Sequence, residues 1–165
     1  MQSLAESIDT SGFSYVACHR SDHLSELVSY WRAKHVDGRL PKRSDIDPAE
    51  IKAHLPYMFM IDVVDGGREY RFRLIGTELA VINGRDSTGK TFAEVYGKDE
   101  RHLAMMREVV GSAVATRQPV RTAGKMFWRP DRAFYPVEGL ILPLSSDGKT
   151  VDVLLGEIAV LPTPA

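Results

Sequence analysis

The sequence has few of the features that mark secreted, membrane-bound or nucleic-acid-binding proteins. Its 165 residues include one cysteine, Cys18, which cannot form an internal disulfide bond and therefore favours a reducing, cytoplasmic compartment. No apolar run approaches the roughly 20 residues that a membrane helix needs, and the N-terminus lacks the basic start of a secretory signal. The net charge of −1 gives no reason to expect a nucleic acid or an anionic membrane as a partner. We therefore expect a cytoplasmic globular protein.

The length suits one domain with a core of its own. We divide it into a flexible N-terminal arm over residues 1–20, helices and a basic loop over residues 21–56, and the core over residues 57–162. The first helix begins at Ser21 or Asp22 and carries an apolar stripe at i, i+3, i+4 and i+7 spacing, formed by Leu24, Leu27, Val28 and Trp31. Two interpretations remain open: the stripe packs on its own domain, or a second chain completes it.

The core begins with a predicted hairpin. The apolar runs 58–64 and 70–75 flank Asp65-Gly66-Gly67, whose residues supply the positive φ angles of a tight turn. In the second run, Tyr70, Phe72 and Leu74 alternate with Arg71 and Arg73. This alternation predicts a strand with one apolar and one basic face.

A long helix is predicted from about Asp99 to Arg117, with Leu103, Met106, Val110 and Ala113 on one face. Three strands follow it at 120–128, 134–144 and 151–161, and Asp147-Gly148 marks the turn between the last two. Five strands linked largely by hairpins predict an α+β fold: an antiparallel sheet with helices on one face and an extra N-terminal amphipathic helix.

This order of elements resembles the PAS domain. The local sequence agrees at Gly84-Arg85, Thr88-Gly89-Lys90-Thr91-Phe92, Glu94-Val95-Tyr96 and Lys98-Asp99-Glu100-Arg101. More narrowly, the chain resembles a family of short bacterial PAS-like proteins at Tyr30-Trp31-Arg32, Pro41, 45–51, Leu55-Pro56 and 70–77. Together these features cover residues 21–161.

The resemblance implies a sensory or signalling module that binds a small molecule between sheet and helices, a protein partner, or both. We expect a homodimer paired through the first helix, with no catalytic output of its own, so that its signal passes through an unidentified signalling partner. The expected pocket residues are Phe72, Leu79, Ile82, Phe92, Met106, Val110, Phe127, Leu140 and Leu142. A fully packed core without a cavity is the alternative. The sequence leaves the cofactor unknown.

One motif competes with this interpretation. Gly84 to Thr91 fits the pattern G-x-x-x-x-G-K-[ST], in which backbone amides, lysine and hydroxyl bind phosphates and Mg²⁺. A small P-loop nucleotide-binding protein is therefore the alternative function. Against it, the preceding apolar run 79–82 is short, and Gly97 ends the following helical stretch within six residues of Phe92. The hairpins downstream also do not build a parallel sheet.

Other chemistry finds little support. Cys18 lies far upstream of the helix that carries the reactive cysteine in flavin photoreceptors of the PAS class. His102 lies on the helix that carries the histidine of haem-binding PAS domains, but at its polar first turn, where we expect a solvated or capping role. The other histidines do not fall at metal-ligand spacing, so no metal site is predicted. Trp128 and Arg73 are the polar-tipped residues that could meet a ligand, although alternation places Arg73 away from the pocket.

Overall fold

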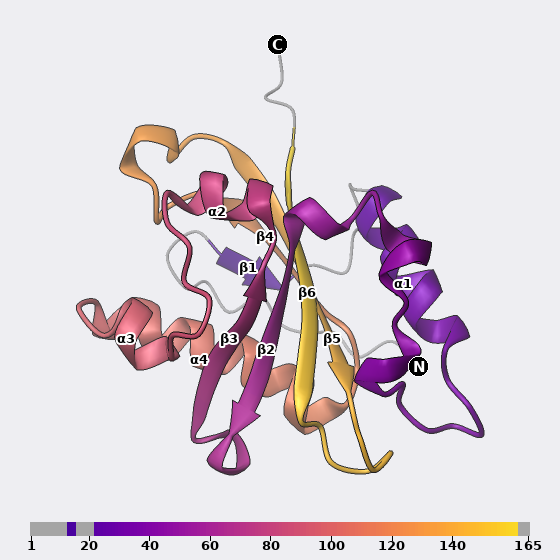
Figure 1. Cartoon of the computed structure of the whole chain (residues 1–165). Helices are drawn as coiled ribbons and strands as arrows, with labels where there is room; N and C mark the ends of the chain where they lie inside the picture. Colours follow the sequence, from indigo (N-terminus) through magenta and orange to yellow (C-terminus); the bar gives the residue numbers. More distant parts are fainter. Residues whose placement is uncertain (1–12, 16–21, 162–165) are drawn as a thin grey trace.

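A computed structural model describes residues 13–15 and 22–161 of the chain (Figure 1). Over these residues the β-strands are β1 Phe13–Tyr15, β2 Met58–Val64, β3 Glu69–Ile75, β4 Val120–Lys125, β5 Pro136–Leu144 and β6 Val153–Val160. The α-helices are α1 Asp22–Ala33, α2 Thr77–Asn83, α3 Phe92–Tyr96 and α4 Glu100–Thr116. Short 3₁₀ turns are η1 Arg43–Asp45, η2 Pro48–Ile51, η3 Leu55–Tyr57, η4 Asp65–Gly67 and η5 Pro130–Arg132.

The strands form one antiparallel sheet in the order β1-β4-β5-β6-β2-β3. The α+β class and the five expected strands are confirmed, with β1 as a short sixth strand at the edge. Strand β1 was not predicted, because three residues are too few to show an alternating pattern. Its residues pair with β4, with Ser14 opposite Ala123. Cys18 lies outside the described residues.

The hairpin between β2 and β3 turns as its sequence predicts. Asp65, Gly66 and Gly67 have φ angles of 51°, 65° and 92°, a run of left-handed residues in which glycine carries little strain. β5 and β6 are antiparallel neighbours, and the predicted turn between them includes Gly148 at φ 78°.

The alternation in β3 is interrupted near its end. Ile61 of β2 stands opposite Phe72, whereas Met60 stands opposite Leu74, so Arg73 is an extra residue in a β-bulge. Tyr70 and Phe72 are buried as expected, but Leu74 is 47% exposed. The prediction for Leu74 was therefore wrong, because a bulge shifts every later side chain to the other face.

The sheet has two differently covered faces. We call inner the face that bears Phe59 and Ile141, which α2, α3 and α4 cover, and outer the face that bears Leu155 and Glu157, on which α1 lies (Figure 1). In β5 every residue after Pro136 is buried, because α4 covers it on one side and α1 on the other.

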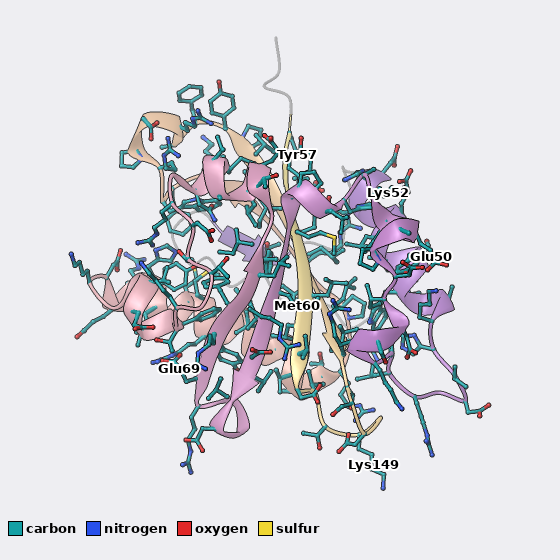
Figure 2. The ribbon with its side chains drawn as sticks, in the orientation of Figure 1. Glu50, Lys52, Tyr57, Met60, Glu69 and Lys149 are labelled. Carbon is teal, nitrogen blue, oxygen red and sulfur yellow. The ribbon has the colours of Figure 1, made fainter. Side chains whose placement is uncertain are left out.

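Helix α1 buries its predicted apolar stripe against its own chain. Leu24, Leu27, Val28 and Trp31 are all less than 9% exposed, and the indole Nε1 of Trp31 donates to the carbonyl of Pro143 at 2.9 Å. At the end of the helix, Lys34 Nζ lies 2.6 Å from a carboxylate oxygen of Glu50, labelled in Figure 2. The stripe therefore packs on its own domain, which is the first of the two interpretations, and no second chain is needed to bury it.

The long helix α4 starts and stops at the predicted residues. The side chain of Asp99 accepts a hydrogen bond from the backbone amide of His102 at 3.0 Å, which caps the first turn. Arg117 ends the helix in the left-handed region at φ 57°. Within residues 13–15 and 22–161, no helix is long and apolar enough to cross a membrane.

Candidate functional site

A cavity of about 550 Å³ lies between the inner face of the sheet and helices α2, α3 and α4. All five strands from β2 to β6 contribute to it: Phe59 and Ile61, Phe72, Thr122, Gly139 and Ile141, and Ile158. Gly139 has no side chain, and a Cβ there would come within 2.5 Å of Thr122 Oγ1. This volume falls in the range of small-molecule pockets, roughly 300–1,000 Å³.

Six of the nine expected pocket residues line this cavity: Phe72, Leu79, Met106, Val110, Phe127 and Leu140. Three do not. Phe92 is fully buried in the core between Tyr70, Phe72 and Tyr96, and Ile82 packs against a smaller cluster around Met126. Leu142 is also fully buried, and its register partner on β6 is Leu155 on the outer face.

The error at β5 has a simple cause. Side chains alternate between faces, and the residues that point to the helices are Gly139 and Ile141 rather than the leucines between and beyond them. Leu140 borders the cavity, but its register partner is Glu157 of the outer face. Both faces of β5 are covered, so a leucine is expected on either face. The sequence therefore did not show which residues of β5 face the helices.

His102 does not have the solvated or capping role expected from its position in the first turn of the helix. It caps nothing with its side chain; instead its half-buried ring lies 4.5 Å from the ring of Tyr96 and 5.0 Å from that of Phe127. Burial lowers the pKa of His102, which Asp99 partly opposes, so the imidazole is held neutral. A side chain in the first turn of a helix is exposed to solvent only where no other element covers it. Here α3 and the segment after β4 cover His102.

The rings form a continuous wall. Phe72, Phe92, Tyr96, His102, Phe127 and Trp128 follow one another with centroid separations of 4.5–5.4 Å. Of these six residues, Phe92 alone does not line the cavity. Burial raises the pKa of Tyr96 far above its usual range, so its phenol keeps its proton and can donate a hydrogen bond.

Several polar residues of the cavity were missed from the sequence: Asn83, Arg85, Ser87, Asp99 and Thr122. Ser87 and Thr122 are almost fully buried, whereas Arg85 and Asp99 are exposed to solvent. The guanidinium of Arg85 donates to the carbonyl of Val95 at 3.0 Å, which holds it over α3. The one available signal was the unusual density of polar residues directly after α2. Arg73, by contrast, pairs with Asp62 at 2.7 Å, outside the cavity, as alternation predicted.

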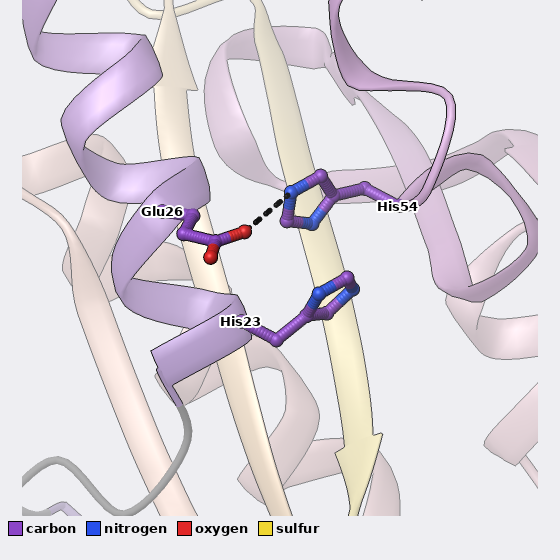
Figure 3. A group of neighbouring side chains, drawn as sticks. All are labelled: His23, Glu26 and His54. Atoms are coloured by element: carbon purple, nitrogen blue, oxygen red, sulfur yellow. Dashed lines mark ion pairs between the residues drawn. The ribbon is translucent and has the colours of Figure 1, made fainter.

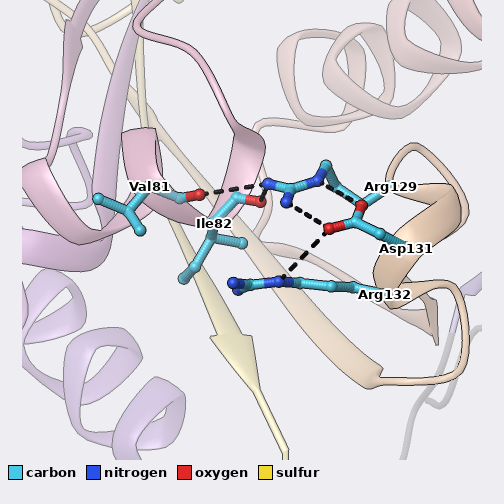
Figure 4. A network of polar contacts seen from close by, with 5 residues as sticks. All are labelled: Val81, Ile82, Arg129, Asp131 and Arg132. Atoms are coloured by element: carbon cyan, nitrogen blue, oxygen red, sulfur yellow. Dashed lines mark hydrogen bonds and ion pairs between the residues drawn. The ribbon is translucent and has the colours of Figure 1, made fainter.

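The segment after β4 is tied to the end of α2 beside the cavity (Figure 4). Arg129 Nη1 donates to the carbonyls of Val81 and Ile82, and its Nε and Nη2 form a two-pronged contact with Asp131. Trp128 Nε1 donates to Asn83 Oδ1 at 3.1 Å. Gly84 ends α2 at φ 77°, and a Cβ there would lie 2.9 Å from Arg129 Nη1, so both backbone and space favour glycine.

The segment from Gly84 to Thr91 does not have the arrangement of a phosphate-binding loop. Its amides are already engaged: Gly89 N donates to Phe72 O, Lys90 N to Ser87 O, and Thr91 N to Glu94. The following helix, α3, has five residues, and the preceding element is α2 rather than a parallel strand. The motif instead turns the chain along the edge of β3.

A second group of chemically active residues lies on the outer face (Figure 3). His23 and Glu26 of α1 and His54, just before η3, bring one ligand atom each within 4.8 Å of one another. Glu157 of β6 lies beneath them with its side chain 1% exposed. Its Oε2 is hydrogen-bonded to Nδ1 of His54 at 2.7 Å, and its Oε1 lies 2.7 Å from Nε2 of His23. Spacing along the sequence could not show this group, because 31 positions separate the histidines and only the fold joins them.

Burial shifts the pKa values of this group toward neutral forms. Burial, and secondly the charge of Glu26, raise the pKa of Glu157 to about 8, whereas burial and then His23 lower the pKa of His54. Both shifts disfavour charge at the buried contact between His54 Nδ1 and Glu157 Oε2, which are 2.7 Å apart.

Comparison with known proteins gives a family. Residues 19–159 match the family model described as "PAS domain", and the sequence has no significant match among curated proteins. Among solved structures, the PAS domain of BvgS from Bordetella pertussis is similar, with a TM-score of 0.51 and 15% identity over 84% of this chain and 88% of that one.

An RNA-binding light-oxygen-voltage receptor is similar with a TM-score of 0.47 and 15% identity over 90% of this chain. This chain corresponds to 37% of that receptor's length. Domains of this family are generally sensory. With the match covering most of its length and with the sheet order described above, the chain belongs to the PAS domain family.

Proposed function

We propose that this domain is a sensor that binds a small organic molecule in its inner cavity and passes the signal to a partner protein. The observation that carries the proposal is the cavity itself, about 550 Å³ bounded by sheet and helices, in a domain whose family is generally sensory. Apart from the residues on its rim, its walls are mainly apolar and aromatic, as in most small-molecule sites.

The wall chemistry favours a ligand with a flat apolar body and one polar end. Phe72, Phe127 and Trp128 offer ring surfaces, and aromatic ligands stack or pack edge-on against such surfaces. Arg85, His102 and Tyr96 gather at one side, where a guanidinium, a neutral imidazole and a phenol can hydrogen-bond an acid or carbonyl.

Haem is the specific cofactor that one observation favours as an alternative ligand. His102 faces the cavity as a neutral imidazole, which is the form that binds iron. The absorption spectrum of the purified protein, with and without added hemin, separates this alternative from an organic ligand without iron.

The test is native mass spectrometry of the purified chain, followed by denaturation to release any bound molecule. Wild-type protein is compared with Met106→Trp, which fills the cavity, and with Ala104→Trp, which adds the same side chain at an exposed position of the same helix. We expect an added mass in wild type and Ala104→Trp that is lost in Met106→Trp.

Two results would contradict the proposal. One is a bare wild-type chain that also fails to take up any member of a library of aromatic acids. The other is equal retention in both tryptophan variants. Uptake of Mg-ATP that disappears in Lys90→Ala would favour the nucleotide-binding alternative instead.

We further propose that the protein acts in the cytoplasm as a homodimer without catalytic output. Its single cysteine supports a reducing compartment. Pairing through Leu24, Leu27, Val28 and Trp31 would require α1 to exchange between two chains, because each of these residues is already buried within one chain. Light scattering of the wild type measures the number of subunits. A monomer at all concentrations would contradict the proposed homodimer.

A further inference from the structure

The group on the outer face has the residue types of a transition-metal site. His23 lies at the second position of α1, Glu26 lies one turn further along the same helix, and His54 reaches them from the turn before η3 (Figure 3). Their ligand atoms lie within 4.8 Å of one another, and the two imidazole rings are stacked with centroids 4.0 Å apart. Two imidazoles and a carboxylate are ligands that zinc prefers.

Glu157 contacts both histidines from below. Its Oε2 lies 2.7 Å from Nδ1 of His54, which leaves Nε2 of that ring facing Glu26, 3.9 Å away. Its Oε1 lies 2.7 Å from Nε2 of His23, which leaves Nδ1 of that ring for another partner. A carboxylate behind a histidine, fixing which nitrogen is free, is the usual second layer of a metal site.

Two further observations describe the surroundings of this group. Oε1 of Glu157 is buried and receives no aligned hydrogen bond despite the close approach of His23, and such groups in native proteins usually have a partner. The side chains of His23 and Glu26 are 37% and 71% exposed, whereas that of His54 is 8% exposed. The group is therefore open to solvent on one side and anchored in the interior on the other.

We propose that His23, Glu26 and His54 bind one divalent transition-metal ion of the zinc class, with Glu157 orienting the histidines and water completing the coordination. The ion cross-links the first turn of α1 to the segment that leads into β2. Metal occupancy thereby fixes α1 on the outer face of the sheet. The site is separate from the inner cavity and does not depend on the function proposed for it.

The test uses the full chain without a histidine tag, stripped with a chelator and then titrated with Zn²⁺ in a calorimeter and with Co²⁺ followed by absorption. We expect one ion per chain, Co²⁺ bands typical of nitrogen and oxygen ligands, and a rise in the melting temperature with Zn²⁺. Glu26→Gln and His23→Gln should each weaken binding at least tenfold. Glu26 is exposed, so its variant is expected to fold normally.

His35→Gln is the matched control, since it removes a histidine that follows the same helix but lies outside the group. It should bind metal like the wild type. The proposal is overturned if the wild type binds no stoichiometric ion. It is also overturned if Glu26→Gln and His23→Gln, shown to be folded by circular dichroism, bind as tightly as His35→Gln.

Discussion

The two faces of the sheet are built from the same alternating strands but are covered in opposite ways. On the outer face one 12-residue helix, α1, lies directly on β5 and β6. The residues of its apolar stripe are almost fully buried against the sheet. On the inner face α2 and α3 have seven and five residues, and a cavity of about 550 Å³ remains beneath them and α4.

Each face also contains a histidine whose pKa burial lowers, and the partners of the two differ. His54 on the outer face is bonded to the buried carboxylate of Glu157. His102 on the inner face is surrounded by the rings of Tyr96 and Phe127 and faces the cavity. The buried polar groups of the outer face thus contact α1, whereas His102 on the inner face lies at the wall of the cavity.

The largest expected effect comes from charging the outer layer. Trp31→Glu buries a carboxylate and removes a large side chain together with its hydrogen bond to Pro143. We expect a loss of roughly 3–5 kcal/mol or more in the free energy of unfolding, measured by urea denaturation. Val36→Glu, at a position 65% exposed just after α1, should change it by no more than about 0.5 kcal/mol. A folded, equally stable Trp31→Glu chain would show that α1 does not lie on its own sheet.

The second prediction tests the bulge in β3. Phe72→Ala should cost about 3 kcal/mol, at the lower end for phenylalanine because the side chain already borders a cavity. Leu74→Ala, two residues away, should cost about 0.5 kcal/mol because Leu74 is half exposed. Equal losses in thermal or chemical unfolding would mean that the strand alternates without interruption and that the bulge is absent.

The third prediction concerns pH and the inner face. Because the folded pKa of His102 is below that of the unfolded chain, the unfolded state binds more protons near pH 6. His102 therefore lowers stability as the pH falls through about 6.5 and below, with Asp99 opposing and Arg85 reinforcing the effect. We expect His102→Gln to lose less stability than the wild type between pH 7 and pH 5.

The measurement for His102 is the difference between two unfolding curves at each pH. Subtraction removes the contributions of His54 and Glu157, which the variant retains. If the two proteins depend on pH identically, His102 is solvated and does not face the interior.

The smallest change in stability is expected at the exposed edge of the sheet, on β2 and β3. Arg73 and Asp62 form a 2.7 Å ion pair with side chains 47% and 28% exposed. A double-mutant cycle with Arg73→Ala and Asp62→Ala should give a coupling energy below about 1 kcal/mol that falls further in high salt. A larger, salt-independent coupling would indicate that this pair is shielded by something covering the outer side of β3.

Local patterns predicted much of the fold. The glycines after Asp65, the stripe of α1, the start of α4 near Asp99 and the turn at Gly148 each depend on neighbouring residues, and each appears where its pattern placed it. The pocket was harder to predict. Phe72, Leu79 and Met106 line the cavity, whereas Leu142 lies on the outer face and the ring of His102 is half buried at the cavity wall.

The sequence by itself determined the class of the protein, because turn residues, hydrophobic period and chain order are local properties that survive without knowledge of the fold. Only the tertiary structure decided which face each buried residue serves and which distant residues meet. A single inserted residue at Arg73 reverses the direction of Leu74, and the meeting of His23, His54 and Glu157 depends on three elements packing together. Contacts of this kind depend on the register of strands and the docking of helices, which no short stretch of sequence specifies.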